Sequence, residues 1–266
     1  MASINTNYGA AIALQNLNKT NSELERTQNR INTGMKVSSA KDSGAIFSIA
    51  TSQRAAAASQ DAVRSSIQRG QSIVDVALAA GDTITSALEE QKGLAVSIAG
   101  STGAAQTSYL AEYNAIGTEI ASALAGATFD GVNLYKANAA AITVQTGAST
   151  SYTLKAIAGA DTAVATTTAA VAGDAATIVA TVDSAITAFT SVLSDFGTKS
   201  KSLGRSITFV NKLQDALEAG VGNLVDADLA KESAKLTALQ TKQQLGVQAL
   251  SIANSASQTL LSLFRN

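Results

Sequence analysis

The chain contains no proline in its 266 residues, whereas a protein of average composition and this length has roughly 13. Proline lacks a backbone N–H donor, and its ring clashes with the preceding turn inside a helix. A chain without proline is therefore free to form very long helices. Aromatic residues make up only 4% of the sequence, so alanine, leucine, isoleucine and valine must fill the core. These side chains suit close packing of helix on helix.

Apolar residues recur at alternating steps of three and four near the N-terminus, which is the pattern of a helix seam. This first stripe runs through Leu14, Leu17, Asn21, Leu24, Gln28, Ile31 and Met35. Buried amides such as Asn21 and Gln28 can fix the register of paired helices, while amides at the rim of a narrow seam only contact solvent. The sequence leaves both interpretations open.

The first stripe stops at residues 36–44, and the same spacing then continues unbroken over residues 46–98. One helix over this segment would be about 80 Å long at 1.5 Å per residue. Shorter stripes follow at residues 110–124 and 189–224. After a slip in spacing, a last stripe runs through Leu229, Leu236, Leu239, Gln243, Val247, Leu250, Asn254, Ser257, Leu261 and Phe264.

The middle of the chain lacks this helical spacing. The segment "ATFDGVNLYK" at residues 127–136 carries a turn signal at Asp130 and Gly131. Beyond it, "AITVQTG" and "SYTLKAIAG" alternate β-branched with other residues, as strands do. We therefore predict a small β-hairpin region at about residues 137–173, nearly the only non-helical part of the protein.

The two halves of the sequence mirror each other, because each end has a short stripe, a break in spacing and a long stripe toward the middle. This predicts a mostly α fold, an elongated rod of long antiparallel coiled-coil helices with both termini helical and paired. We expect residues 1–42 and 226–266 to form the two halves of one helical domain, and residues 43–225 to form another that includes the hairpin.

Two paired helices with apolar residues up to the last turn would still expose apolar surface, so further copies of the chain are expected to cover it. The residues assigned to this seam and to packing between copies are Leu14, Leu17, Leu24, Ile31, Leu229, Leu236, Leu239, Leu250, Leu261 and Phe264.

Catalytic and metal-binding chemistry has few side chains to use in this sequence. There is no Cys and no His, which excludes the usual zinc sites and the common nucleophile–base pairs. The acidic residues Asp226, Asp228 and Glu232 lack the glycine and spacing of a calcium loop, and they fit the first turn of a helix, where negative charge is favourable. We expect no enzymatic activity, no cofactor and no metal.

Charge and hydropathy limit the partners. A formal net charge of −1 argues against nucleic acid. No stretch reaches 18 consecutive apolar residues, so no membrane span is expected. The first positive charge is Lys19, and a standard cleaved signal peptide, which needs a basic start, is therefore not expected.

The N-terminal segment "SINTNYGAAIALQNLNKTNSELERTQNRINTGMKVSSAKDSGA" resembles the opening of bacterial flagellins, which typically read S-I-N-T-N, L-N-K, R-L-S-S-G and I-N-S-A-K-D-D-A-A. Arg30, Gly34 and residues 39–42 match this order. The C-terminal "ANSASQTLLSLFR" resembles the flagellin ending A-N-x-x-P-Q-x-x-L-S-L-L-R, with Ser257 in place of the proline. The central "ATFDGVNLY" resembles the T-x-F-N-G turn of the same family.

The resemblance implies a structural subunit that polymerises into the extracellular bacterial flagellar filament for swimming motility. It implies export through the flagellar secretion channel. The implied partners are many copies of the chain, the export apparatus with a secretion chaperone, the filament cap and the hook-junction proteins. It also implies termini that are disordered in the monomer and pair as helices lining the filament core. A hinge is implied near residues 36–44 and 225–228, and the chain looks minimal, without outer insertion domains.

Three alternatives differ from a filament subunit in testable ways. A flagellar hook-associated junction protein shares the helical ends but normally has a more divergent C-terminus. An enzyme would have to work with carboxylates alone. A chemoreceptor-like signalling coiled coil would need a membrane span.

Two further segments resemble functional parts of flagellins. Residues 87–97, "ALEEQKGLAVS", are similar to the segment by which a vertebrate Toll-like receptor senses flagellins. Leu88, Lys92 and Leu94 keep its outline, while Glu90 replaces an arginine, so weak stimulation is expected.

The central turn departs from the family at one position, where Asp130 replaces the family's asparagine before Gly131. Aspartate and asparagine both tolerate left-handed backbone geometry. The subunit fold should therefore be unaffected, and we expect the added charge to alter filament shape.

Overall fold

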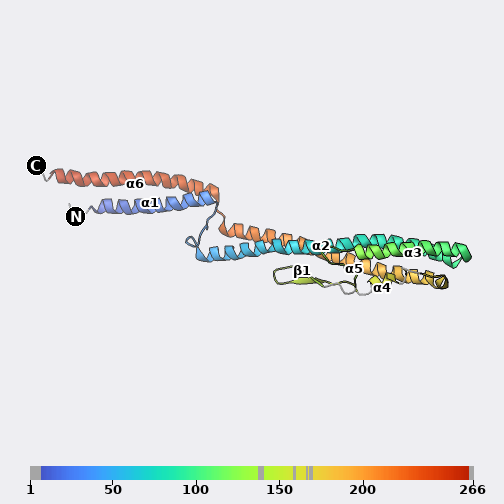
Figure 1. Ribbon diagram of the computed structural model, residues 1–266. Helices are drawn as coiled ribbons and strands as arrows, with labels where there is room; N and C mark the ends of the chain where they lie inside the picture. Colours follow the sequence, from blue (N-terminus) through green and yellow to red (C-terminus); the bar gives the residue numbers. More distant parts are fainter. Residues whose placement is uncertain (1–6, 137–140, 158–159, 166, 168–169, 264–266) are drawn as a thin grey trace. The chain divides into compact units, whose positions relative to one another are not determined.

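The computed structural model describes residues 7–136, 141–157, 160–165, 167 and 170–263, and it is mostly helical (Figure 1). Its elements are α1 (Tyr8–Thr33), α2 (Gly44–Ala99), α3 (Gly103–Gly126), β1 (Ile142–Gln145), β2 (Ser151–Leu154), α4 (Ala160–Ala165), the 3-10 helix η1 (Ala172–Asp174), α5 (Ile178–Val225) and α6 (Leu229–Leu263). Long helices and one small hairpin confirm the predicted fold class.

The chain divides into two compact units. The terminal unit contains Met1–Ala55 and Ala216–Asn266, and the central unit contains Ala56–Asp215. The divisions lie inside α2 and α5, 13 residues from the predicted boundary at 42/43 and 10 residues from that at 225/226. The reason is a small apolar cluster in the terminal unit, where Val37 and Ala50 pack with Val221 and Val225. This cluster holds the first turns of α2 and the last turns of α5 in the terminal unit.

Helices α1 and α6 pack along each other in the terminal unit (Figure 1). Asn7 caps α1, because its side-chain oxygen accepts a hydrogen bond from the Ala10 N–H at 3.0 Å. Gly34 ends α1 in the left-handed conformation at φ 69°, which glycine adopts without steric cost. Asp228 caps α6 by accepting from the N–H groups of Ala230 and Lys231, as expected for an acidic residue at a helix N-terminus.

The α1 side of this seam differs from the predicted stripe in one of its two positions. Leu17, Leu24 and Ile31 are half-buried, but the second position is taken by Ala13, Thr20 and Thr27, and only Thr27 is fully buried. Leu14 is 48% exposed and Gln28 is exposed. Small side chains occupy this position because they let the two backbones approach closely.

The α6 side follows the same rule. Leu239 is 3% exposed, and Leu236 and Leu250 are half-buried. Next to them the seam uses Gly246 and Ala253 rather than the predicted Val247 and Asn254, which are exposed. A side-chain carbon on Gly246 would lie 3.3 Å from Leu17 Cδ1, which is a tight contact, so glycine favours this close approach.

Besides the exposed Leu14, three of the predicted seam residues lie outside the seam that the structure describes. Leu229 is the first residue of α6 and is 50% exposed, while Glu232 takes the half-buried position one turn later. Phe264 lies outside the described residues. The backbone of Leu261 continues α6, but its side chain is among those not described.

The core of the central unit combines α2, α3, α5 and the hairpin. Tyr135 stacks on Phe189 with ring centroids 5.5 Å apart and meets the edge of Phe196 at 5.4 Å. On the facing side of α2, Gly81 leaves room for them, because a side-chain carbon there would lie 2.7 Å from the Tyr135 hydroxyl and would also meet Leu193. Three of the aromatic residues of the sequence thus pack together in this core.

The predicted hairpin region contains two short antiparallel strands. β1 pairs with β2 in the register Ile142 with Leu154 through Gln145 with Ser151. The other described residues of 137–173 are not strand, since α4 and η1 follow the hairpin. Gly70 on α2 lets the hairpin pack closely, because a side-chain carbon there would lie 2.6 Å from Val144 Cγ2.

One described helix, α5, is long and apolar enough to cross a membrane when judged by length and composition alone. A single such helix is weak evidence, because core helices of other proteins have the same property. Phe189, Phe196 and Leu203 of α5 are fully buried in the central core, although only 28% of its most apolar stretch is buried.

Candidate functional site: assembly surfaces and connectors

The paired helices α1 and α6 leave large apolar side chains in contact with solvent. Tyr8 is 80% exposed and Ile252 is 69% exposed. Among the described side chains of these two helices, the exposed apolar set is Tyr8, Ile12, Leu14, Leu229, Leu245, Val247 and Ile252. Apolar surface grouped in this way commonly marks an interface.

The exposed residues of α6 lie on more than one face. Leu245 and Ile252 are seven residues apart and share a face, while Leu229 and Val247 are 18 residues, or five full turns, apart and share another. The seam residues Leu239 and Leu250 point to α1. Helix α1 covers only one side of α6, so these apolar residues are left without cover from α1.

Polar contacts fix the antiparallel register of α1 and α6. The Asn7 side chain donates to the Ala253 carbonyl at 2.8 Å, and the Gln243 side chain donates to Asn21 Oδ1 at 2.8 Å. Asn21 is half-buried, so it lies at the rim of the seam. It also pairs with the opposite helix, so both interpretations of this amide apply.

An ion pair closes the other end of the seam. Arg30 Nη1 lies 2.9 Å from Glu232 Oε1, with side chains 19% and 12% exposed. Arg30 Nε and Glu232 Oε2 are buried without a protein partner among the described residues. Removing either residue would therefore strand a largely buried charge, which is costly.

Two connectors join these helices to α2 and α5. The first connector, residues 34–43, follows α1, and the second, residues 226–228, precedes α6. The Lys36 and Val37 N–H groups both donate to the Val225 carbonyl, at 2.6 and 3.3 Å, and the Ala227 N–H donates to the Gly34 carbonyl at 2.9 Å. The implied hinge segments are thus hydrogen-bonded to each other.

The segment similar to a receptor-binding region lies on α2 and has one face toward the core and one toward solvent. Leu88 is fully buried and Leu94 is half-buried against the central core, while Glu90 and Lys92 are exposed. Lys92 Nζ lies 2.6 Å from Asp183 Oδ1. Glu90 therefore presents its charge to solvent, whereas Leu88 serves the core.

The central turn has the geometry that its sequence predicts. Asp130 and Gly131 both have positive φ, 52° and 77°, and Phe129 and Val132 exchange two backbone hydrogen bonds around them. This is the arrangement of a two-residue hairpin turn, in which Asp-Gly is favoured. Asp130 also forms an ion pair with Arg69 of α2, which the sequence did not indicate.

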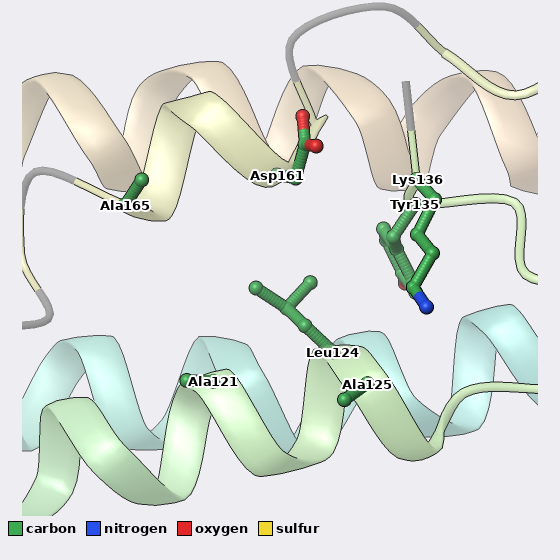
Figure 2. A pocket seen from close by; sticks show the side chains of 7 residues that line it. All are labelled: Ala121, Leu124, Ala125, Tyr135, Lys136, Asp161 and Ala165. Atoms are coloured by element: carbon green, nitrogen blue, oxygen red, sulfur yellow. The ribbon is translucent and has the colours of Figure 1, made fainter. Parts of the chain in front are cut away.

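A pocket of about 350 Å³ lies in the central unit beside α3 and α4 (Figure 2). Its lining residues are Ala121, Leu124, Ala125, Tyr135, Lys136, Asp161 and Ala165. The lining is mainly apolar, and the Tyr135 hydroxyl already donates to the Ala77 carbonyl. Within the described residues, no group of three acidic side chains gathers to hold a metal ion.

Two buried tyrosines have altered acidity. Burial, and secondarily the negative charge of Asp174, raises the pKa of Tyr113 to about 12. Burial, and secondarily Asp82, also raises the pKa of Tyr135 well above its ordinary value. Both groups are packed in the core, so these shifts report burial and matter for stability.

Several contacts were missed by sequence reasoning. Thr27 and Gly246 lack the hydrophobic signal of a seam residue, although both are small. Arg30 and Glu232 lie far apart in the sequence. Asp42 was identified as a family match, and its hydrogen bonds to the preceding serines follow a short-range pattern typical of Ser and Asp in turns.

Comparison with known proteins finds flagellins along the whole chain. Residues 4–140 match the family model described as the bacterial flagellin N-terminal helical region, and residues 179–264 match the model of the C-terminal helical region.

Individual relatives are similar from end to end. Flagellin FljN of Caulobacter vibrioides is 53% identical over 269 aligned residues, which cover 99% of this chain and 98% of that protein. A flagellin of Brucella melitensis is 37% identical over 281 aligned residues, covering both chains completely. The crystal structure of Bacillus cereus flagellin covers 53% of this chain and 86% of that one, with a TM-score of 0.48 and 23% identity.

Proposed function

The chain belongs to the bacterial flagellin family, and we propose that the apolar residues left exposed on α1 and α6 are the surfaces on which its copies pack in the filament core. Flagellins are structural proteins, and the chain is a subunit that polymerises into the flagellar filament, an extracellular structure. End-to-end similarity to flagellins gives no support to the hook-junction alternative.

One observation carries this assignment of the surface. α6 exposes Leu245 and Ile252 on the face away from α1, where the isolated chain offers no cover among the described residues. Burying a leucine or isoleucine side chain contributes about 1.5–3 kcal/mol. A polymer repeats this gain in every subunit, so exposed apolar residues on a terminal helix favour assembly.

The decisive experiment replaces this face without changing the seam. A Leu245→Gln, Ile252→Gln double variant keeps the side chains close in size and removes their apolar character. Thr241→Gln is a matched control, because Thr241 is exposed on the same helix and already polar. Purified monomers are mixed with filament seeds and examined by electron microscopy, with circular dichroism to check helix content.

We expect the Thr241→Gln protein to form filaments and the double variant to stay monomeric with unchanged central helices. Filaments of normal length and yield from the double variant would show that this face of α6 is not an assembly surface.

The remaining partners and the domain roles are part of the same proposal and rest on family membership. They are export through the flagellar secretion channel with a chaperone and without a cleaved signal peptide, and contact with the filament cap and the hook-junction proteins. Residues 1–42 and 226–266 would form the filament-core domain, and residues 43–225 the outer part.

A further inference from the structure

The first connector consists of two parts that are held by different bonds. Residues 34–37 are paired with residues 225–227 through backbone hydrogen bonds. Among the described residues, 38–42 make no hydrogen bond to the second connector. They are instead arranged around a single side chain, Asp42.

One oxygen of Asp42 accepts four hydrogen bonds. The N–H and hydroxyl of Ser38 donate to Oδ2 at 3.1 and 3.2 Å, and the N–H and hydroxyl of Ser39 donate to it at 3.1 and 3.2 Å. The Asp42 N–H donates back to the Ser39 carbonyl at 3.1 Å. Hydrogen bonds to an ionised acceptor are about twice as strong as neutral ones.

We propose that Asp42 is a latch, whose negative charge keeps residues 38–42 folded independently of the backbone pairing that holds residues 34–37. The implied hinge is therefore not a freely flexible linker. Its second half is closed by one carboxylate and opens when that charge is lost. The latch belongs to the single subunit, so it goes beyond the proposed assembly surface and is tested without filaments.

The ionic contact of Asp42 is secondary to these hydrogen bonds. Arg26 of α1 approaches Oδ1 only to 3.9 Å, and its side chain is 54% exposed. Exposed pairs of this kind contribute little. Burial raises the pKa of Asp42, but the hydrogen bonds from Ser38 and Ser39 outweigh this and hold the pKa below its ordinary value of 3.8, which is the effect expected when they favour the ionised form.

The test is amide hydrogen exchange measured by NMR on the full-length monomer near neutral pH. In the Asp42→Asn variant we expect exchange of the Ser38 and Ser39 amides to accelerate roughly tenfold, because charge-assisted bonds are lost. The Lys36 and Val37 amides, which donate to Val225, should keep their rates. Equal acceleration at all four amides would show a general loosening of the connector and would overturn the proposal, as would no change at any of them.

Three further variants separate the causes. Glu25→Gln removes a charge from an exposed residue of α1 and should leave all four rates unchanged. The Ser38→Ala, Ser39→Ala double variant removes the hydroxyl donors but keeps the N–H donors, so a smaller acceleration is expected. Arg26→Gln should have almost no effect, and an effect as large as that of Asp42→Asn would assign the role to the ion pair instead.

The native protein provides a test that needs no variant to fold. On acidification, the Ser38 and Ser39 amide signals should shift together with one midpoint below pH 3.8. Independent titration of these two amides would contradict a shared acceptor. Normal filaments from the Leu245→Gln, Ile252→Gln variant would refute the proposed assembly surface, but they would not affect the proposal for Asp42.

Discussion

The central unit encloses a cluster of large rings, with Tyr135, Phe189 and Phe196 fully buried, although Phe209 remains exposed. In the terminal unit the exposed residues include Leu245 and Ile252 of α6. The same contrast holds for the glycines, since Gly81 is enclosed by its own unit and Gly246 contacts only the partner helix. The central unit thus completes its core within one chain, while the terminal unit has apolar faces that other copies can cover. The two units should therefore respond differently to the same kind of change.

The largest effect is expected from a charge in the terminal seam. Leu17→Asp or Leu250→Asp places an unpaired carboxylate against apolar neighbours. This costs several kcal/mol of helix-pairing free energy, unless the pKa of the carboxyl group rises and the group becomes neutral. We expect soluble monomers that do not assemble, with the helices of the central unit intact by circular dichroism. Asn18→Asp, at an exposed position of α1, adds the same charge and should assemble. Normal filaments from either leucine variant would show that assembly does not depend on the apolar seam of the terminal unit.

Removal of residues 258–266, which include Leu261 and Phe264, tests the last turns of the same stripe. We expect the truncated chain to remain monomeric in the seeded assay. Normal assembly would show that the end of the predicted seam is dispensable.

A smaller effect is expected when the core of the central unit is overfilled. In Gly81→Ala the new methyl group would lie 2.7 Å from the Tyr135 hydroxyl and would also meet Leu193, so a loss of about 1–3 kcal/mol in the free energy of unfolding is expected. Gly93 lies on the same helix with nothing within 4 Å, and Gly93→Ala should stabilise the protein by about 1 kcal/mol. Urea unfolding followed by circular dichroism measures the free energy of unfolding of both variants. A change in the same direction for Gly81→Ala and Gly93→Ala would contradict the packing described.

The sequence predicted helices better than it predicted which residues face inward. Spacing of three and four identifies a helix because the period is a property of the backbone. The choice between Leu14 and Ala13, or between Val247 and Gly246, depends on how closely two helices approach, and hydrophobicity does not encode that distance. Small residues win at close crossings even when a larger apolar residue is adjacent.

Long-range polar pairs could not be predicted for a different reason. Arg30 with Glu232 and Asp130 with Arg69 join residues that are 202 and 61 positions apart, and no local pattern connects them. The turn at Asp130 and Gly131 was predictable because the backbone angles it needs are a local property of these two residue types.

Alkaline pH should destabilise the central unit selectively. Tyr113 has a pKa of about 12 in the folded protein and near 10 when unfolded, so its contribution is complete below pH 10 and is lost as the pH rises toward 12. The loss is about 1.4 kcal/mol for each pH unit in that window. Tyr113→Phe should flatten this dependence in urea unfolding at pH 9 and pH 11. The tyrosine of α1, Tyr8, is 80% exposed, so Tyr8→Phe should leave it unchanged.

A smaller and external effect is expected at the receptor-like segment of the central unit. Glu90 is exposed and carries a charge opposite to the arginine usual in flagellins, so the monomer should stimulate the vertebrate Toll-like receptor weakly or not at all at nanomolar concentration. Glu90→Arg should raise the response about tenfold, equivalent to about 1.4 kcal/mol. Glu89→Arg makes the same charge change about 100° around the helix and should not. A strong response from the native monomer would refute the assignment.

The smallest change in energy is expected at the turn of the central unit, where Asp130 pairs with Arg69. Both side chains are about half exposed, and exposed pairs contribute about 0.2–1 kcal/mol. Two packings of one sequence can differ by only a few kcal/mol, and a polymer repeats any bias between them in every subunit. We expect filaments of Asp130→Asn to differ from native filaments in wavelength or curvature in electron micrographs, with the subunit fold unchanged. If the pair is responsible, Arg69→Gln should alter the shape in the same way. If the carboxylate charge itself is responsible, Arg69→Gln should change the filament shape in the opposite direction, because this variant leaves Asp130 without its ion-pair partner. Identical shapes of native, Asp130→Asn and Arg69→Gln filaments would show that the charge has no effect.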